Sequence, residues 1–212
     1  MCNKQFVITV LSKIAEKIEE QKDFLTDLDR PIGDSDHGIN LARGFSEVKK
    51  KLSQYAEKEI ADIVRDTGMT LVSNVGGASG PLYGSAFMKA AKAFSGKTEI
   101  SIADFIAGME MACDAVMQRG KAAAEEATML DAMIPALAAM KKTFAENKNP
   151  ARILSDGVKA AWDGVSHTKN LIATKGRASY VGERGLGHQD PGATSFAFML
   201  ETVKNEYEIV HG

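Results

Sequence analysis

The chain has 212 residues, with 26 Lys and Arg against 28 Asp and Glu and a formal net charge of −2 at pH 7. This near balance argues against a nucleic-acid-binding face or a polybasic anchor, so we expect neither a direct nucleic-acid partner nor a membrane partner. We expect one domain over residues 1–212. Two cysteines, Cys2 and Cys113, without metal-ligand spacing indicate a cytoplasmic protein.

The first predicted element is an amphipathic helix. Its apolar residues Phe6, Val10, Ile14 and Ile18 recur every fourth position, a period typical of a one-sided helix. Similar patterns predict seven more helices, at residues 39–56, 59–74, 80–95, 101–119, 129–146, 150–174 and 191–209. Three of them begin with capping pairs: Ser101 with Asp104, Asn149 with Pro150, and Asp190 with Pro191. No strand alternation is convincing, so we predict an all-α bundle of antiparallel, up-and-down helices.

An acidic segment, D-R-P-I-G-D-S-D-H-G-I-N, separates the first two helices at residues 29–40. Asp34 and Asp36 are two apart in chain that we expect to be extended, which would point both carboxylates to one side. Asp29 could join them by folding across the turn at 31–33. Three carboxylates repel unless a cation lies among them, and hard oxygen ligands suit magnesium better than zinc. The alternative is an ordinary surface turn in which Asp36 caps the next helix.

Other connections also carry unusual residues. The stretch V-G-G-A-S-G-P at 75–81 precedes a helix, so its amides could meet an anion, although glycines also permit a sharp turn without a ligand. A long loop after Lys175 combines basic, glycine-rich and acidic elements, and such loops are usually functional or disordered. In an eight-helix up-and-down bundle, the loops around Asp34, Ser79, Gly120 and Gly187 would meet at one rim. Their combination predicts a nucleotide-phosphate site with a metal.

Several motifs, in order, resemble one known family. They are G-D-S-D-H-G-I-N at 33–40, T-G-M-T-L at 67–71, G-G-A-S-G-P-L-Y-G at 76–84, R-G-K-A at 119–122, K-G-R-A-S-Y at 175–180 and G-E-R-G-L-G-H-Q-D-P-G-A at 182–193. The chain resembles the ADP-binding L subunits of bacterial dihydroxyacetone kinases, which are related to the C-terminal domain of single-chain kinases. The resemblance spans nearly the whole chain. It implies a closed barrel of eight antiparallel helices with the nucleotide at one end.

The resemblance also assigns residues, position by position. It implies that Asp29, Asp34 and Asp36 bind two Mg²⁺ ions. It further implies that twelve residues line the ADP pocket: His37, Gly38, Ile39, Asn40, Ala78, Ser79, Gly120, Met129, Arg177, Asp190, Pro191 and Gly192. Arg177 is the expected catalytic residue, because its guanidinium can offset charge during phosphoryl transfer.

The family's mechanism implies two partner subunits. A K subunit holds dihydroxyacetone, and a phosphohistidine on a phosphotransferase-system M subunit phosphorylates bound ADP, whose γ-phosphate then passes to the sugar. Two alternatives stay open: an ATP-dependent kinase module for another short ketose, and a non-catalytic regulator that binds a transcription factor. One departure is Glu125-Glu126-Ala127, because family members often carry glycine, an acidic residue and lysine there. The missing lysine removes a positive charge and could alter nucleotide affinity or partner choice.

Overall fold

The computed structural model describes residues 1–211. The α-helices in this range are α1 (Lys4–Glu20), α2 (Lys22–Asp29), α3 (His37–Lys51), α4 (Ile60–Asn74), α5 (Ser79–Ala90), α6 (Ile102–Gly120), α7 (Leu130–Glu146), α8 (Pro150–His167) and α9 (Pro191–His211). Short 3₁₀ helices are η1 (Leu52–Gln54), η2 (Ala91–Phe94), η3 (Thr168–Asn170), η4 (Arg177–Tyr180) and η5 (Gly182–Gly185). Strands β1 (Cys2–Asn3) and β2 (Glu99–Ile100) pair antiparallel.

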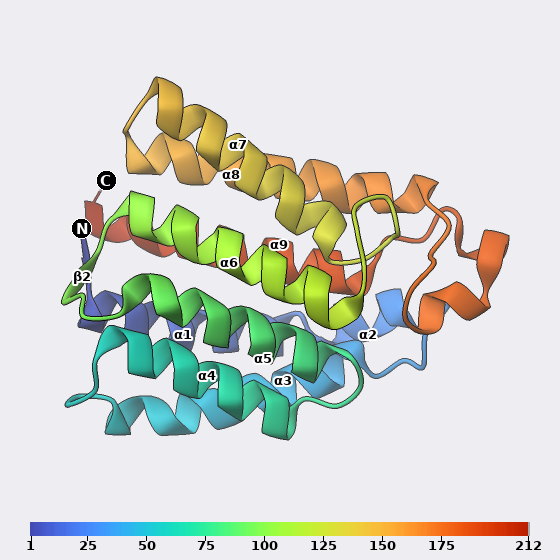
Figure 1. Ribbon diagram of the computed structural model, residues 1–212. Helices are drawn as coiled ribbons and strands as arrows, with labels where there is room; N and C mark the ends of the chain where they lie inside the picture. Colours follow the sequence, from blue (N-terminus) through green and yellow to red (C-terminus); the bar gives the residue numbers. More distant parts are fainter. Residues whose placement is uncertain (212) are drawn as a thin grey trace.

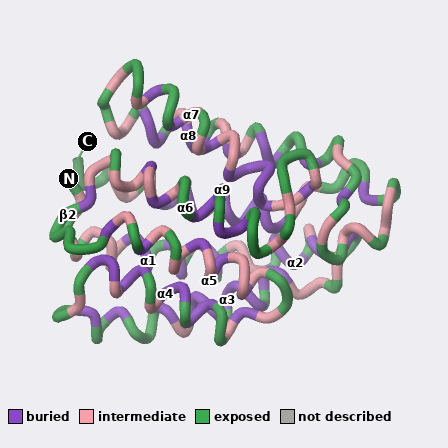
Figure 2. The backbone as a smooth tube through the Cα atoms, viewed as in Figure 1, coloured by how far each residue is buried: buried purple, intermediate pink, exposed green. Residues whose placement is uncertain are grey.

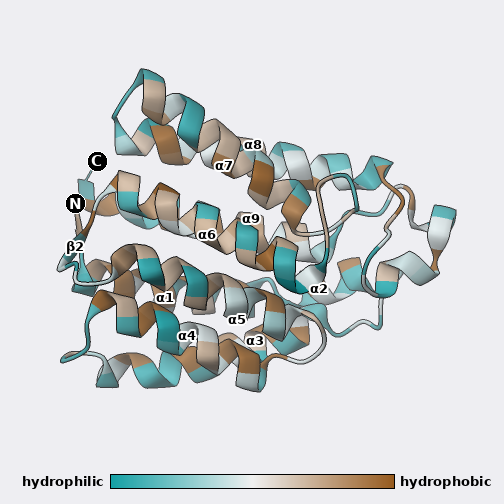
Figure 3. Ribbon diagram, in the orientation of Figure 1, coloured by the Kyte–Doolittle hydropathy of each residue, from teal (hydrophilic) through white to brown (hydrophobic). Residues whose placement is uncertain are grey.

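The long helices form a closed ring (Figure 1). In chain order from α3 to α9 each helix packs against the next, α1 packs against α3, and α9 returns to pack against α1. Buried and exposed stretches alternate along the helices (Figure 2), and hydrophobic and hydrophilic residues alternate with them (Figure 3). Each helix therefore turns its apolar face to the barrel interior, as an amphipathic period requires. The predicted all-α, closed up-and-down barrel is confirmed.

Several element bounds differ from the prediction. Helix α2 was missed, because eight residues are too few to show a helical period clearly. The helix predicted at 150–174 ends at His167, where the chain tightens into η3 and the Thr168 hydroxyl donates to the Val165 carbonyl at 2.6 Å. The predicted helices 39–56 and 80–95 likewise finish in η1 and η2. The two strands have two residues each, which is too short for a visible alternation.

The predicted helix starts are correct at three positions. Ser101 and Asp104 form a reciprocal capping box, and the Asn149 side chain accepts from two backbone amides at the start of α8. Asp190 Oδ2 accepts from the Ala193 amide at 2.6 Å. These caps satisfy amides that have no partner inside their helices, and they fix where the preceding loops end.

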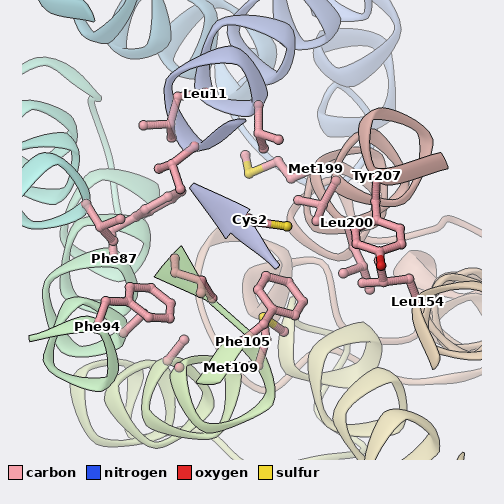
Figure 4. Close-up of a pocket in the computed structure, with 18 of the residues that line it drawn as sticks. Cys2, Leu11, Phe87, Phe94, Phe105, Met109, Leu154, Met199, Leu200 and Tyr207 are labelled. Carbon is pink, nitrogen blue, oxygen red and sulfur yellow. The ribbon is translucent and has the colours of Figure 1, made fainter. Parts of the chain in front are cut away.

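The barrel interior contains a cavity of about 390 Å³ near the two chain termini. Apolar side chains from several helices surround it (Figure 4), among them Leu11, Phe87, Phe105, Met109, Met199 and Leu200. The β1–β2 pair and the start of α6 border it, so the cavity lies at the end opposite the loops that follow α2, α4, α6 and α8. Within residues 1–211, no helix is both long and apolar enough to cross a membrane.

Candidate functional site

Four loops meet at the end of the barrel that lies far from the chain termini (Figure 1). They are the connections at 30–36, 75–78, 121–129 and 168–190. They share this end because successive long helices alternate in direction, as the up-and-down arrangement predicts. The residues expected to form a site therefore lie on one rim.

Three carboxylates converge at this rim. Asp29, Asp34 and Asp36 each offer an oxygen, and these oxygens lie within 4.8 Å of one another. The turn after α2 folds back as expected, with the Gly33 amide donating to the Asp29 carbonyl at 2.6 Å. The expected extended backbone between Asp34 and Asp36 was wrong. Ser35 has a left-handed φ of 61°, and this tight turn, rather than a strand-like alternation, brings the two side chains together.

Asp29 also holds the start of α3. Its Oδ2 accepts from the backbone amides of Asp36 at 2.9 Å and His37 at 3.4 Å. Asp36 stands at the N-cap position, but its side chain makes no capping hydrogen bond. The alternative interpretation of Asp36 as an ordinary helix cap is therefore wrong, since Asp29 binds the amides and leaves the Asp36 carboxylate available.

The electrostatics of this cluster favour a cation. Burial, followed by the negative charges of Asp34 and Asp29, raises the pKa of Asp36. One positive group is close: an Arg177 guanidinium nitrogen from η4 lies 2.8 Å from Asp34 Oδ2. Three carboxylates with one arginine leave a net negative charge. Hard oxygen donors in this number fit Mg²⁺, which binds one or two carboxylates together with water and phosphate oxygens.

A chain of polar groups leads from the rim into the barrel. His37 Nδ1 lies 3.2 Å from Oγ of Ser79, the first residue of α5, and His37 Nε2 lies 3.0 Å from Ser195 Oγ in α9. The Tyr83 hydroxyl lies 2.7 Å from Ser195 Oγ. Burial lowers the pKa of His37 to about 4, so the imidazole is neutral at neutral pH.

Asn40 connects the acidic turn to the glycine-rich loop. Its Oδ1 accepts from Arg43 at 2.7 Å, and Arg43 Nε donates to the Asn74 carbonyl at the end of α4 at 2.9 Å. The Asn40 backbone amide donates to the Asp36 carbonyl at 2.8 Å, and the nearby Asn40 side chain partly opposes the rise in the pKa of Asp36. A Cβ atom on Gly76 would lie 2.8 Å from Asn40 Oδ1, so a side chain at this position would displace the Asn40 amide group. The loop amides and the N-terminus of α5 thus lie beside the carboxylates, where they can bind an anion.

A second part of the rim surrounds Asp190. Its side chain is half-buried, and desolvation of the carboxylate raises its pKa to about 7. The Asp190–Gly192 turn lies close to Met129, which is 5% exposed: a Cβ atom on Gly192 would lie 3.5 Å from Met129 Cβ. The Pro191 ring occupies the first position of α9. This apolar and rigid surface is suited to a planar base.

The predicted residues are not all equally connected. Hydrogen bonds or ion pairs join His37, Ser79 and Arg177 to one another or to the carboxylates, and Asn40 is bonded to Arg43, as described above. The others share the rim without such bonds: Gly38 is buried, Ile39 is 50% exposed, Ala78 precedes α5, and Gly120 ends α6 beside Leu82. Ligand contacts for all of these positions, and a catalytic role for Arg177, stay predictions.

Sequence reasoning missed how two acidic residues, Asp131 and Glu126, shape the loop at 121–129. Asp131 is 4% exposed, and its two oxygens accept from the amides of Glu125 at 2.5 Å and Thr128 at 2.7 Å. The spacing of Thr128 and Asp131 matches part of a capping box, which could have indicated this role. Glu126 accepts from the Thr174 hydroxyl at 2.7 Å, which ties the loop to the segment before Arg177. No local sequence pattern predicts the contact between Glu126 and Thr174.

Comparisons with known proteins identify the family of this chain. Residues 31–205 match the DAK2 domain family. The chain is 40% identical over 195 residues to the ADP-binding subunit DhaL of the PEP-dependent dihydroxyacetone kinase of Escherichia coli, covering 92% of this chain and 93% of that protein. It is 41% identical over 201 residues to the corresponding subunit of kinase 1 of Listeria innocua, covering 95% and 96%. It is 43% identical over 193 residues to the ADP-binding subunit DhaL of the PTS-dependent kinase of Lactococcus lactis, covering 91% and 92%.

Solved structures share the fold. The native dihydroxyacetone kinase of C. freundii superposes with a TM-score of 0.74 at 22% identity, covering 95% of this chain and 34% of that longer chain. The structure of the same kinase in complex with AMP-PNP and Mg²⁺ gives a TM-score of 0.72. At this level of identity the structural likeness supports the barrel alone.

Proposed function

This chain belongs to the DAK2 domain family, and we propose that it is the ADP-binding subunit of a multi-subunit dihydroxyacetone kinase, built as a single nucleotide-binding domain. In this proposal, a phosphohistidine on a phosphotransferase-system M subunit phosphorylates bound ADP. The γ-phosphate then passes to dihydroxyacetone held on a K subunit.

Sequence identity favours the separate-subunit form, since the matched bacterial subunits are 40% to 43% identical to this chain and the C. freundii kinase is 22% identical. The matched subunits from Escherichia coli, Listeria innocua and Lactococcus lactis align along more than nine tenths of their own length. The C. freundii kinase is a much longer chain, of which this protein spans about a third. The proposal therefore assigns the sugar-binding and phosphate-donating steps to partner chains.

The observation that carries the proposal is the cluster of Asp29, Asp34 and Asp36 beside the N-terminus of α5. These residues would hold two Mg²⁺ ions, which when bound offset the negative charge of phosphate oxygens. The carboxylates are suited to this task because Asp29 is fixed by backbone amides and Asp36 is left without a capping bond.

Other residues would position the nucleotide. The Ala78 and Ser79 amides and the dipole of α5 favour phosphate oxygens, and Arg177 is close enough to neutralise charge on the transferred group. Met129 and the turn at Asp190 would form the wall for the base. In-line phosphoryl transfer needs mainly positioning and charge neutralisation, so this set of groups is adequate for the chemistry.

Mass spectrometry of the nucleotide released by denaturing the purified, extensively dialysed protein tests the proposal. We expect about one ADP per chain, because a cofactor that stays bound through many turnovers must dissociate slowly. A protein that is isolated empty and exchanges ATP rapidly would support the ATP-dependent alternative instead. A protein that retains ADP but transfers no phosphate when supplied with K and M subunits would support the regulator.

A further inference from the structure

A buried chain of polar groups runs through Tyr83, Ser195, His37 and Ser79, and two of its members, Tyr83 and Ser195, have no role in the proposed function so far. Ser195 is 0% exposed, Tyr83 is 3% exposed and His37 is 7% exposed. The residues come from α9, α5 and α3, and they connect the barrel interior to the first residue of α5. The Tyr83 ring also lines the apolar cavity, so its hydroxyl is the polar end of an otherwise apolar wall.

The direction of each hydrogen bond in this chain depends on the tautomer of His37. A neutral imidazole has one N–H donor and one acceptor nitrogen, and here both nitrogens face hydroxyl groups. If Nε2 carries the proton, Nδ1 accepts from Ser79 and consumes its only hydroxyl hydrogen. If Nδ1 carries the proton, it donates to Ser79 Oγ and leaves that hydrogen free.

A phosphate oxygen can only accept a hydrogen bond, so a Ser79 that binds phosphate must donate. That requirement selects the Nδ1-protonated tautomer and obliges Ser195 to donate to Nε2 at 3.0 Å. The Gly192 carbonyl competes for the Ser195 hydrogen at 3.0 Å. The Tyr83 hydroxyl lies 2.7 Å from Ser195 Oγ, and by donating to that oxygen it leaves the Ser195 hydrogen for Nε2.

We propose that Ser195 and Tyr83 are positioning residues that hold His37 as the Nδ1-protonated tautomer, so that the Ser79 hydroxyl donates to a phosphate oxygen of the nucleotide. This inference rests on the proposed function, because it takes the anion at α5 to be a nucleoside diphosphate. In this arrangement Tyr83 donates to Ser195, Ser195 donates to His37 Nε2, His37 Nδ1 donates to Ser79, and Ser79 donates to the phosphate oxygen.

Nitrogen-15 NMR of the histidine rings tests the tautomer directly. We expect the His37 signals of the Nδ1-protonated form in the wild-type protein, both free and with Mg²⁺ and ADP. The Ser195→Ala variant removes the donor to Nε2 and should shift these signals toward the other tautomer. Tyr83→Phe keeps the ring in the cavity wall and should give a smaller shift in the same direction. A wild-type His37 protonated at Nε2 would overturn the inference.

Affinity measurements separate positioning from a general structural role. Calorimetry should show Ser195→Ala weakening ADP binding about tenfold, as expected for loss of a well-aligned bond to a charged group, with adenosine affinity unchanged. Ser73→Ala is the matched control, since the Ser73 hydroxyl also donates to a carbonyl of its own helix, at 3.0 Å, but lies on an exposed face of α4. Its ADP affinity should equal that of the wild type.

A double-mutant cycle completes the design. Because Ser195 acts through Ser79, adding Ser195→Ala to Ser79→Ala should cause no further loss of ADP affinity. Additive losses would show that Ser195 only supports the fold and would overturn the inference. If Ser79→Ala itself leaves ADP affinity unchanged, the assignment of Ser79 to the phosphate site fails. If the wild-type protein binds no ADP, the proposed function fails, while the tautomer measurement still decides the hydrogen-bond direction.

Discussion

Arg177 in η4 forms an ion pair with Asp34 in the acidic turn, with a guanidinium nitrogen 2.8 Å from Asp34 Oδ2. The two side chains are 69% and 36% exposed, so the pair contributes little to stability and can exchange for other partners. The proposed catalytic arginine thus contacts a proposed metal ligand. We infer that the guanidinium compensates the carboxylates and is free to move to phosphate oxygens.

Replacing Arg177 should separate metal binding from transfer. Arg177→Gln lacks the positive charge that lies beside Asp34. In the absence of nucleotide, this variant is expected to bind Mn²⁺, a spectroscopic substitute for Mg²⁺, at least as tightly as the wild type. Phosphate transfer should fall by about 10² or more, because charge on the transferred group is no longer offset. Electron paramagnetic resonance titration and a transfer assay measure the two effects. Arg65→Gln, which breaks an exposed ion pair with Asp62 on α4, is the control. Equal transfer rates in both variants would refute the role of Arg177.

Gly33 should be required for the position of Asp29. A Cβ atom there would overlap Asp29 Oδ1, so Gly33→Ala must displace the carboxylate that holds the start of α3. We expect ADP affinity in Mg²⁺ to fall at least tenfold by calorimetry. The control is Gly185→Ala at the same end of the barrel, where the added atom would meet Val181 at an ordinary 3.5 Å. Similar affinities in the two variants would contradict the geometry of the acidic turn.

Asp131 should control the loop at 121–129. Asp131→Asn keeps one acceptor oxygen but leaves either the Glu125 or the Thr128 amide without its partner, at a cost of about 1–3 kcal/mol. Hydrogen exchange should become faster in this loop, and the protein should bind ADP more weakly while it retains its fold. Asp114→Asn, on an exposed part of α6, is the control. Unchanged exchange in the loop would show that Asp131 does not organise it.

Asp190 should make stability depend on pH. The folded protein keeps this carboxyl protonated up to a pKa of about 7, whereas the unfolded chain releases the proton near pH 4. Between these values the folded state binds more protons, so its contribution to stability falls as pH rises from about 4 to 7 and then levels off. Asp190→Asn removes this dependence. Urea unfolding should show the variant more stable by on the order of 2 kcal/mol at pH 8, with no difference near pH 4. If the free energy of unfolding changed with pH in the same way in the wild type and in Asp190→Asn, the prediction would be contradicted.

Local patterns in the sequence were sufficient to predict the barrel fold. The four-residue period of Phe6, Val10, Ile14 and Ile18 belongs to α1, and the caps at Ser101, Asn149 and Asp190 mark true helix starts. Because most connections are short, neighbouring helices were expected to run antiparallel. That arrangement places the four loops at one rim. The acidic turn was found because its residues are close in sequence.

Contacts between distant residues could not be predicted in this way. His37 and Ser195 are 158 positions apart, and Ser195 stands in α9 without any feature that distinguishes it from other helical serines. Glu126 meets Thr174 across 48 positions. The left-handed Ser35 was missed for a different reason, since this conformation is uncommon outside glycine, asparagine and aspartate. Such features depend on the closed barrel as a whole, which no local pattern encodes.

The most direct test of the central claim is a calorimetric titration of ADP into nucleotide-free Asp36→Asn protein in the presence of Mg²⁺. The account predicts that this variant loses detectable ADP binding while its unfolding temperature stays close to that of the wild type, because Asp36 makes no capping bond. Asp62→Asn, an exposed aspartate on α4, should bind ADP normally. Wild-type ADP affinity in Asp36→Asn would contradict the claim that these carboxylates hold the metal and the nucleotide.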